Sequence, residues 1–271
     1  MHFANKCKWI LRLCVFPALI VVIILSCFFV IKHFKTNNQE IVSGYYSLAV
    51  NLKTHHVFSY PGSPMTPTAY RAPLYPAFLY LFAGNKDNNI KMAFVAQLVL
   101  FILTILLIWH IANFLTKSAF ASLVAVGIYS LNPQTIKYVA SFGVEFFYGF
   151  LLLSIIGVLL HALDSKKWHI NYYVIGFVLI GVSITCKSPM AFFPPILALW
   201  LYFKPSSPVA LKRKVFLLLT VSYLILFPWI LRNANEFHEF IPFERYVPLT
   251  NIYTASKGMA KSCLPSEARK H

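Results

Sequence analysis

A single arginine in the long polar segment after the first apolar run could bind a phosphate. Arg71 is followed closely by Pro73 and Pro76, which restrict the backbone around it. A guanidinium held rigidly near a bilayer surface matches the geometry of a phosphate, which it can bind through two parallel hydrogen bonds. The alternative is that Arg71 only anchors the segment at the membrane surface.

Three further charged residues border apolar runs. Glu145 opens one run, Lys187 follows another, and Arg232 closes the last. A carboxylate inside a membrane is costly and usually functional, although pairing with Lys137 or Lys187 would make Glu145 a structural contact. Arg232 is equally typical of a helix end at the membrane interface. Together with Arg71, these residues predict a surface for an anionic ligand.

Other common kinds of site have no support in the sequence. The five cysteines are scattered, without a C-x-x-C pair, which argues against a zinc site or a disulfide framework. His55 and His56 are adjacent, but such a pair in a loop is weak support for a metal. Walker, G-x-S-x-G and H-E-x-x-H motifs are absent from the sequence. We therefore predict no metal ligands, and no cofactor is certain; a divalent metal stays open.

The composition is that of a membrane protein. Of the 271 residues, 58% are hydrophobic and 12% are charged, whereas a soluble domain carries roughly 25% charged residues. The apolar residues form runs long enough to cross a bilayer. The formal net charge of +16 does not indicate nucleic-acid binding, because the charges lie between apolar runs instead of forming the basic face of a soluble domain.

The runs predict an all-α, polytopic bundle of about seven transmembrane helices. The first has a basic flank but no small-residue cleavage site, so we interpret it as a retained anchor. Residues 1–234 would form the membrane domain, including a long outer loop at 32–91, and 235–271 a short outer tail. Three runs are short enough to be tilted or re-entrant segments. The expected spans are 14–31, 92–115, 119–131, 143–163, 171–185, 190–203 and 215–231.

The positive charge of the short links predicts the orientation. The N-terminus and the links 116–118, 164–170 and 204–214 would be cytoplasmic. The loop 32–91, the turns at 132–142 and 186–189, and the C-terminus would lie outside. Within that loop, residues 45–52 predict an amphipathic helix on the membrane, with the rings of Tyr45 and Tyr46 at headgroup depth.

The order of these features resembles a known family. Tyr-x-x-x-Ala-x-Asn-Leu at 45–52 precedes Arg-x-Pro-Leu-Tyr-Pro at 71–76, and Pro-Trp-x-x-Arg-Asn follows at 228–233. With Glu145 and Lys187 between them, this order resembles the bacterial GT-C glycosyltransferases, the superfamily of protein O-mannosyltransferases and aminoarabinose transferases. The resemblance covers residues from about 10 to 250, apparently only the N-terminal part of such enzymes, which are usually longer.

The resemblance implies roles for individual residues. Arg71, Lys187 and Arg232 match basic positions that bind the donor phosphate, and Glu145 matches an acid at the head of the fourth span. The family's catalytic acid would fall three or four residues before Tyr45, where this chain has Val42 and Ile41. Glu40 is the nearest acid, and we interpret it as the general base.

The resemblance further implies an enzyme of the bacterial inner membrane. It would move a sugar from a polyprenyl-phosphate donor to a lipid, glycan or protein acceptor on the outer face. A truncated or inactive relative, or one completed by a second polypeptide, is also compatible with the shorter chain. Two alternatives are a transporter or flippase for an anionic lipid and a non-enzymatic membrane subunit. Turnover of a lipid-phosphate sugar would separate the enzyme from both.

Overall fold

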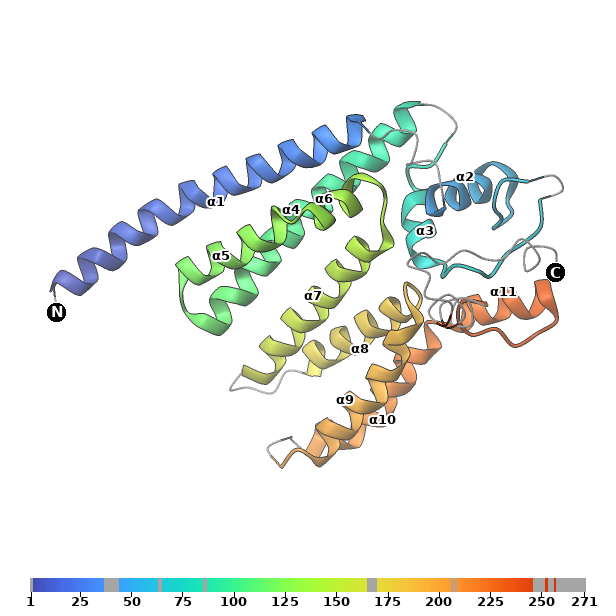
Figure 1. The fold of residues 1–271 in the computed structure, drawn as a ribbon. Coiled ribbons are helices and arrows are strands. Elements are labelled where there is room, and N and C mark those ends of the chain that lie inside the picture. Colours follow the sequence, from blue (N-terminus) through green and yellow to red (C-terminus); the bar gives the residue numbers. More distant parts are fainter. Residues whose placement is uncertain are drawn as a thin grey trace.

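The regular secondary structure of the described residues is helical, as the computed structural model shows (Figure 1). The structure describes residues 2–36, 44–62, 65–84, 87–164, 170–205, 207, 209–245, 252 and 256. Its α-helices are α1 (His2–Thr36), α2 (Tyr45–His55), α3 (Leu74–Tyr80), α4 (Asp87–Thr116), α5 (Ala119–Ser130), α6 (Pro133–Ala140), α7 (Val144–Asp164), α8 (Ile170–Ile184), α9 (Phe193–Phe203), α10 (Val209–Leu224) and α11 (Phe227–Phe237). A 3₁₀ helix, η1 (Ser188–Phe192), precedes α9. The predicted all-α class is confirmed.

Every expected apolar run coincides with helix, but the count of seven spans is not confirmed. Three helical segments in the described residues are long and apolar enough to cross a membrane: Val15–Phe34, Asn88–Thr116 and Val144–Leu163. The apolar segments Ala119–Ser130, Ile170–Ile184 and Ser188–Phe203 are shorter. The run expected at 215–231 is two helices, α10 and α11, bent by 41°. Pro228 lies in the first turn of α11, where its missing N–H costs no helical hydrogen bond.

A helix also forms where the sequence analysis placed only a turn, at 132–142. Asn132 caps α6, because its side-chain oxygen accepts hydrogen bonds from the backbone N–H groups of Gln134 and Thr135. Pro133 occupies the first helical position, for which its fixed φ is suited. The polar cap and the proline therefore start a new helix with only two residues between it and the end of α5 at Ser130.

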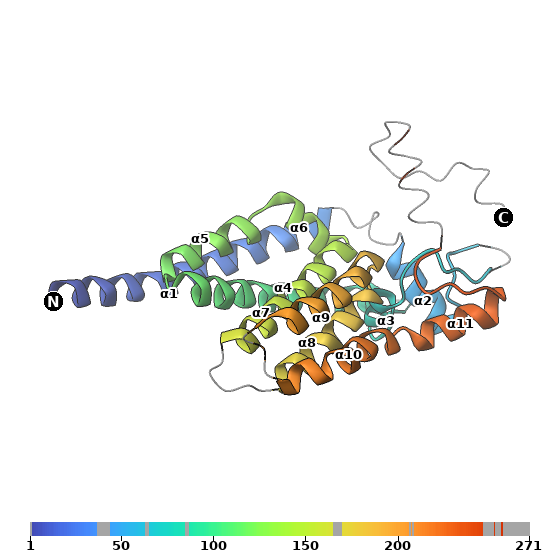
Figure 2. The same cartoon turned by 90° about the horizontal axis from the view of Figure 1, so that it is seen from below.

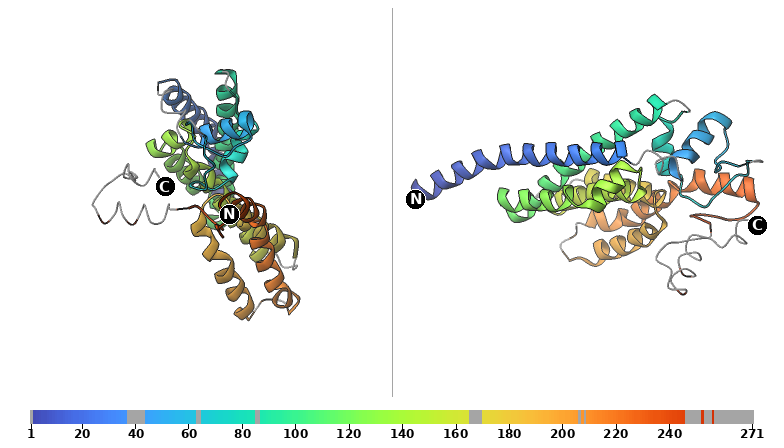
Figure 3. Two further views of the ribbon diagram at one scale, coloured as in Figure 1. Left: turned by 90° about the vertical axis from the view of Figure 1, so that its right-hand side faces the viewer. Right: turned by 45° about the horizontal axis from the view of Figure 1, so that its top comes forward.

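The helices form two packed groups with separate cores. One core is built mainly from α1, α3, α4, α6 and the first half of α7, with Tyr75, Phe101 and Ile105 among its buried side chains. The other lies between the second half of α7 and helices α8, α9 and α10. Figure 3 shows the α9–α10 pair projecting away from α1 and α4. Helix α7 belongs to both groups and joins them.

Small residues allow α8 and α10 to approach closely. A Cβ atom added to Gly181 would lie 2.5 Å from the backbone oxygen of Ser222. The Ser222 hydroxyl in turn donates a hydrogen bond of 2.8 Å to the carbonyl oxygen of Phe177. Within a membrane, where apolar burial drives helix association weakly, this kind of backbone contact is a main source of packing energy.

The two ends of the bundle differ in chemistry. At the first, which we call the basic end, α4 is followed by α5, α7 by α8 and α9 by α10; the described cations there are Lys117, Lys204, Lys212, Arg213 and Lys214. At the opposite end, which we call the site end, α2 and α3 lie beside α11 (Figure 2). A third small core of Leu48, Phe58, Ala69, Trp229 and Ile241 fills the space between α2, α11 and the loop after α2.

The Gly181 contact makes a stability prediction. Gly181→Ala should lower the thermal unfolding temperature of the purified protein in detergent, because overpacking of this kind typically costs about 1–3 kcal/mol. Gly149→Ala in α7 is the matched control, since a Cβ there meets nothing within 4 Å. A Gly181→Ala protein that unfolds at the same temperature as the Gly149→Ala protein would contradict the close packing of α8 on α10.

Candidate functional site

An ion pair between Glu145 and Lys187 lies at the site end. Glu145 is in the first turn of α7, and Lys187 is the extended residue that precedes η1. The Lys187 Nζ atom lies 3.0 Å from Glu145 Oε1, with the side chains 29% and 43% exposed respectively. The same ammonium lies 5.9 Å from the centre of the Tyr148 ring. An ion pair this exposed contributes only about 0–1 kcal/mol to stability, so Lys187 is free to exchange its partner at little cost.

Arg71 is held among aromatic rings. Its guanidinium carbon lies 5.2 Å from the centre of the Tyr45 ring and 5.0 Å from that of Tyr70, and the Tyr60 hydroxyl is close enough to influence the pKa of Arg71. The Arg71 Nε atom is buried and has no hydrogen-bond partner among the described residues. The other buried side-chain atoms in that condition are serine hydroxyls. A buried N–H donor without a partner costs roughly 1–3 kcal/mol, a cost that an acceptor bound beside it would remove.

Arg71 and the ion pair belong to one neighbourhood, which Tyr45 connects. Burial raises the pKa of the Tyr45 hydroxyl; Arg71 opposes this shift, and the negative charges of Glu145 and Glu244 add to it. The backbone agrees with this proximity, since the N–H of Leu74, three residues after Arg71, donates to the carbonyl oxygen of Thr185 at 3.0 Å. Glu145 and Lys187 are thus paired, and the loop that carries Arg71 lies in the same region. That these three residues form one site stays a prediction.

The two tyrosines of α2 face the protein. The ring of Tyr45 packs edge-on against Tyr75, with centroids 5.4 Å apart, and Tyr46 stacks on Phe142 at 5.6 Å. Tyr46 is only 2% exposed, and its hydroxyl donates to the Gly84 carbonyl oxygen at 3.3 Å. The helix expected at 45–52 is present, but these two rings do not extend into a headgroup layer. They were expected there because a sequence of tyrosines and polar residues has the same periodicity whichever face is buried.

Arg232 has a different set of partners from the other three charged residues. Its Nη1 atom donates to the carbonyl oxygen of Thr68 at 2.9 Å and to Asn233 Oδ1 at 2.8 Å. The guanidinium also lies over the rings of Phe58, Trp229 and Phe237, at 5.2–5.6 Å from their centres. In this structure Arg232 holds the loop that leads to Arg71, and its expected role in phosphate binding stays a prediction.

Neighbouring residues of the same motif complete this clamp. The Trp229 Nε1 atom donates to the carbonyl oxygen of Phe243 at 3.5 Å, and the Asn233 side chain donates to that of Ile241 at 2.9 Å. The segment held in this way returns to the loop, where the N–H of Arg245 donates to the Ala69 carbonyl oxygen at 2.8 Å. The motif at 228–233 thus ties α11, the residues after it and the Arg71 loop together.

Sequence reasoning missed Glu244 because it assigned this residue to the outer tail. Glu244 follows Phe243, whose carbonyl oxygen accepts from Trp229. It is close enough to Tyr45 and Cys186 for its charge to raise the pKa of both groups. Burial is the main reason that the pKa of the Cys186 thiol rises to about 12, against the opposing charge of Lys187. That thiol is therefore protonated at neutral pH and is no nucleophile.

The structure does not test Glu40 as general base, and it gives no support for a divalent metal. Glu40, with Ile41 and Val42 beside it, lies outside the described residues. In the part of the chain that is described, no three side chains of His, Cys, Asp or Glu form a group that could hold a metal ion. Tests of both expectations therefore belong to experiment.

Comparisons with known proteins agree with the resemblance seen in the sequence. The family model described as dolichyl-phosphate-mannose-protein mannosyltransferase matches residues 70–231, which is more than half of the chain. The match includes Arg71, Glu145 and Lys187 and ends one residue before Arg232. Neither the curated proteins nor the solved structures contain a significant match. This family is of the GT-C type and implies a lipid-linked sugar donor. The chain belongs to the dolichyl-phosphate-mannose-protein mannosyltransferase family of membrane glycosyltransferases.

Proposed function

We propose that this protein transfers a sugar from a polyprenyl-phosphate donor to a lipid, glycan or protein acceptor on the outer face of a bacterial inner membrane. Family membership supports transfer from a lipid-linked donor. The observation that carries the rest is the buried Nε atom of Arg71, which has no partner among the described residues, in the region of the partly exposed Glu145–Lys187 pair. Two cations near one carboxylate at the end of a bundle suit a sugar phosphate, which brings an anion and several hydroxyl groups.

The reaction is a displacement at the anomeric carbon of the sugar. An acceptor oxygen forms a bond to that carbon while the bond from the carbon to the phosphate oxygen breaks. The electron pair of the broken bond stays on the polyprenyl phosphate, and the acceptor proton passes to a carboxylate that acts as general base. Cations placed at the leaving phosphate stabilise the negative charge that develops there.

Arg71 and Lys187 are the two cations in this proposal. The aromatic rings around Arg71 fix its guanidinium before the donor arrives, so little ordering is required on binding. Lys187 would turn from Glu145 to the phosphate, because the exposed ion pair is weak. Glu145, released from Lys187, would accept hydrogen bonds from the hydroxyl groups of the sugar or the acceptor.

Two carboxylates compete for the role of general base. Glu40 is favoured by its position just before α2, although it stands one residue from the position that the family resemblance implies. Glu244 is favoured by its electrostatic proximity to Tyr45 and by the clamp that holds its segment. Each has a conservative replacement by glutamine, which removes the charge and keeps the size.

The proposal is tested by transfer of labelled sugar from polyprenyl phosphate in membranes, run beside a measurement of donor binding. Replacing the true base by glutamine should lower the transfer rate by about 10²–10⁴-fold and leave donor binding nearly unchanged. Arg71→Ala should instead weaken donor binding by roughly ten- to a hundredfold, because it removes a charge-assisted contact. If Glu40→Gln and Glu244→Gln both transfer as fast as the parent, neither is the base. A parent that binds donor without ever transferring sugar would contradict the proposed activity.

A double-mutant cycle separates the two interpretations of Arg232. If Arg232 acts only by holding the Thr68 carbonyl oxygen, Arg232→Ala in an Arg71→Ala background should weaken donor binding no further. If Arg232 binds the phosphate itself, the two losses should multiply. Unfolding temperatures of the parent, the two single variants and the double variant, measured in parallel, show whether any loss of binding comes from a damaged fold.

The positive charges of the basic end predict that this end of the bundle faces the cytoplasm. Reporter fusions after Lys117 and Lys214 should report cytoplasm, and a fusion after Gly62 should report the outside, since basic links stay on the cytoplasmic side. A cytoplasmic signal at Gly62 would place the Arg71 site on the wrong face for an outer-face transferase.

A further inference from the structure

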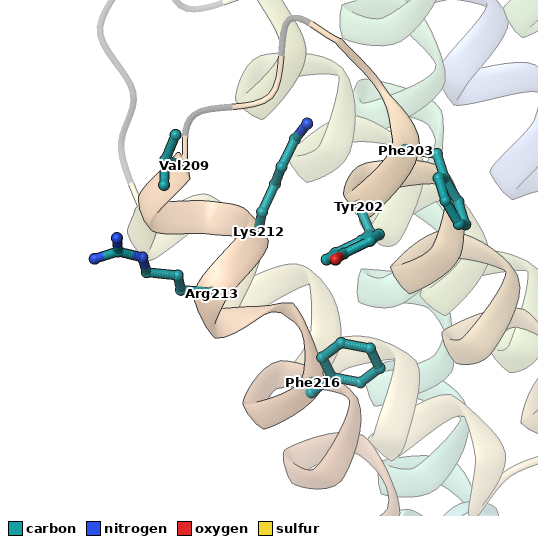
Figure 4. Close-up of a pocket in the computed structure, with 6 residues that line it drawn as sticks. All are labelled: Tyr202, Phe203, Val209, Lys212, Arg213 and Phe216. Atoms are coloured by element: carbon teal, nitrogen blue, oxygen red, sulfur yellow. The ribbon is translucent and has the colours of Figure 1, made fainter.

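An open pocket of about 530 Å³ lies at the basic end, between the last turn of α9 and the first turns of α10. Figure 4 shows the residues that line it, which are Tyr202, Phe203, Val209, Lys212, Arg213 and Phe216. The pocket lies at one end of α9, and η1 and Lys187 lie at the other. The length of this helix, at 1.5 Å per residue, is roughly 16 Å. The pocket is therefore distinct from the candidate transfer site.

The walls of the pocket are aromatic and exposed. The Tyr202 ring lies 6.0 Å from that of Phe216 and 5.3 Å from that of Phe203, between ring centres. Phe203 is 72% exposed and Phe216 59% exposed. In Figure 4 the Tyr202 hydroxyl points toward α10, the Lys212 side chain extends toward the link between α9 and α10, and Arg213 extends outward. The pocket thus combines apolar walls with a hydroxyl and two cations.

The described charged side chains around this pocket are all positive. None of the described residues that line the pocket is acidic, and Lys214 follows Lys212 and Arg213 on α10. Lys204, at the end of α9, lies 4.7 Å over the Trp200 ring. Basic links are expected on the cytoplasmic side of any membrane protein, but orientation alone does not require aromatic side chains grouped around the cations.

We propose that this pocket binds an anionic phospholipid from the leaflet at the basic end. The ammonium of Lys212 and the Tyr202 hydroxyl would donate to the phosphate of the headgroup, and an acyl chain would lie along Phe203 and Phe216. Membranes attract basic segments by roughly fivefold in affinity for each Lys or Arg near an anionic surface. A phosphate fits the charge of the pocket, and an acyl chain fits its walls, so a lipid matches the site better than a soluble anion does.

The test is a titration of the purified full-length protein, in detergent, with phosphatidylglycerol and with phosphatidylcholine, followed by native mass spectrometry. Phosphatidylglycerol should bind more tightly, and Lys212→Gln should weaken its binding by about fivefold. Lys214→Gln is the matched control, because it removes the same charge from the same turn of α10 but does not line the pocket. Its effect should be clearly smaller than that of Lys212→Gln, because Lys214 is not among the residues that line the pocket.

Three results would overturn the proposal. Equal losses in the Lys212→Gln and Lys214→Gln proteins would mean that only diffuse charge attracts the lipid. Equal binding of the two lipids would remove the role of the headgroup charge. Displacement of phosphatidylglycerol by inorganic phosphate at similar concentration would mean that the apolar walls contribute nothing. Lys212→Arg should retain binding, which distinguishes a lost contact from a misfolded protein.

Discussion

The loop between α2 and α3 depends on hydrogen bonds that come from other parts of the chain. Its backbone is non-helical and lies beside apolar helices, where an unsatisfied carbonyl oxygen is expensive. Arg232 donates to Thr68, the N–H of Arg245 donates to Ala69, and the Asn51 side chain donates to Ser59. On the far side of Arg71, Leu74 is bonded to Thr185. The position of Arg71 is thus determined by α2, α8 and α11 together.

These constraints give the two cations of the site different properties. Arg71 is fixed between rings, and its buried Nε donor has no partner among the described residues. Lys187 lies on a short non-helical link, is partly exposed and has a carboxylate partner that it can leave. In the proposed reaction, the rigid Arg71 would orient the phosphate and the more mobile Lys187 would close on it.

Much of this architecture was predictable, because apolar runs and polar links are strong local signals. The grouping of Arg71, Glu145 and Lys187 was inferred from their positions beside apolar runs and stays a prediction. The bend before α11 was not predicted, since the apolar run continues through residues 225 and 226, and only Pro228 marks the start of a new helix. The same limit applies to α6, whose Asn132 and Pro133 signal was interpreted as a turn.

What the sequence could not provide at the site has a different origin, because it concerns which way a side chain points. Nothing local distinguishes an arginine that binds a ligand from one that donates to the Thr68 carbonyl oxygen 164 residues away in sequence. Glu244 enters the neighbourhood of Tyr45 only because Trp229 and Asn233 fold the residues after α11 back onto the loop. Such long-range contacts are invisible in composition and periodicity.

The bend of 41° between α10 and α11 also has a mechanical consequence. A helix in a bilayer changes its tilt as the local thickness of the hydrocarbon changes. In a continuous rod, rotation at the start of α10 would be passed to Arg232 and would strain its bond to Thr68. Residues 225 and 226, which are not helical, lie between α10 and Arg232, so a change in the tilt of α10 need not be carried in full to the clamp on the Arg71 loop.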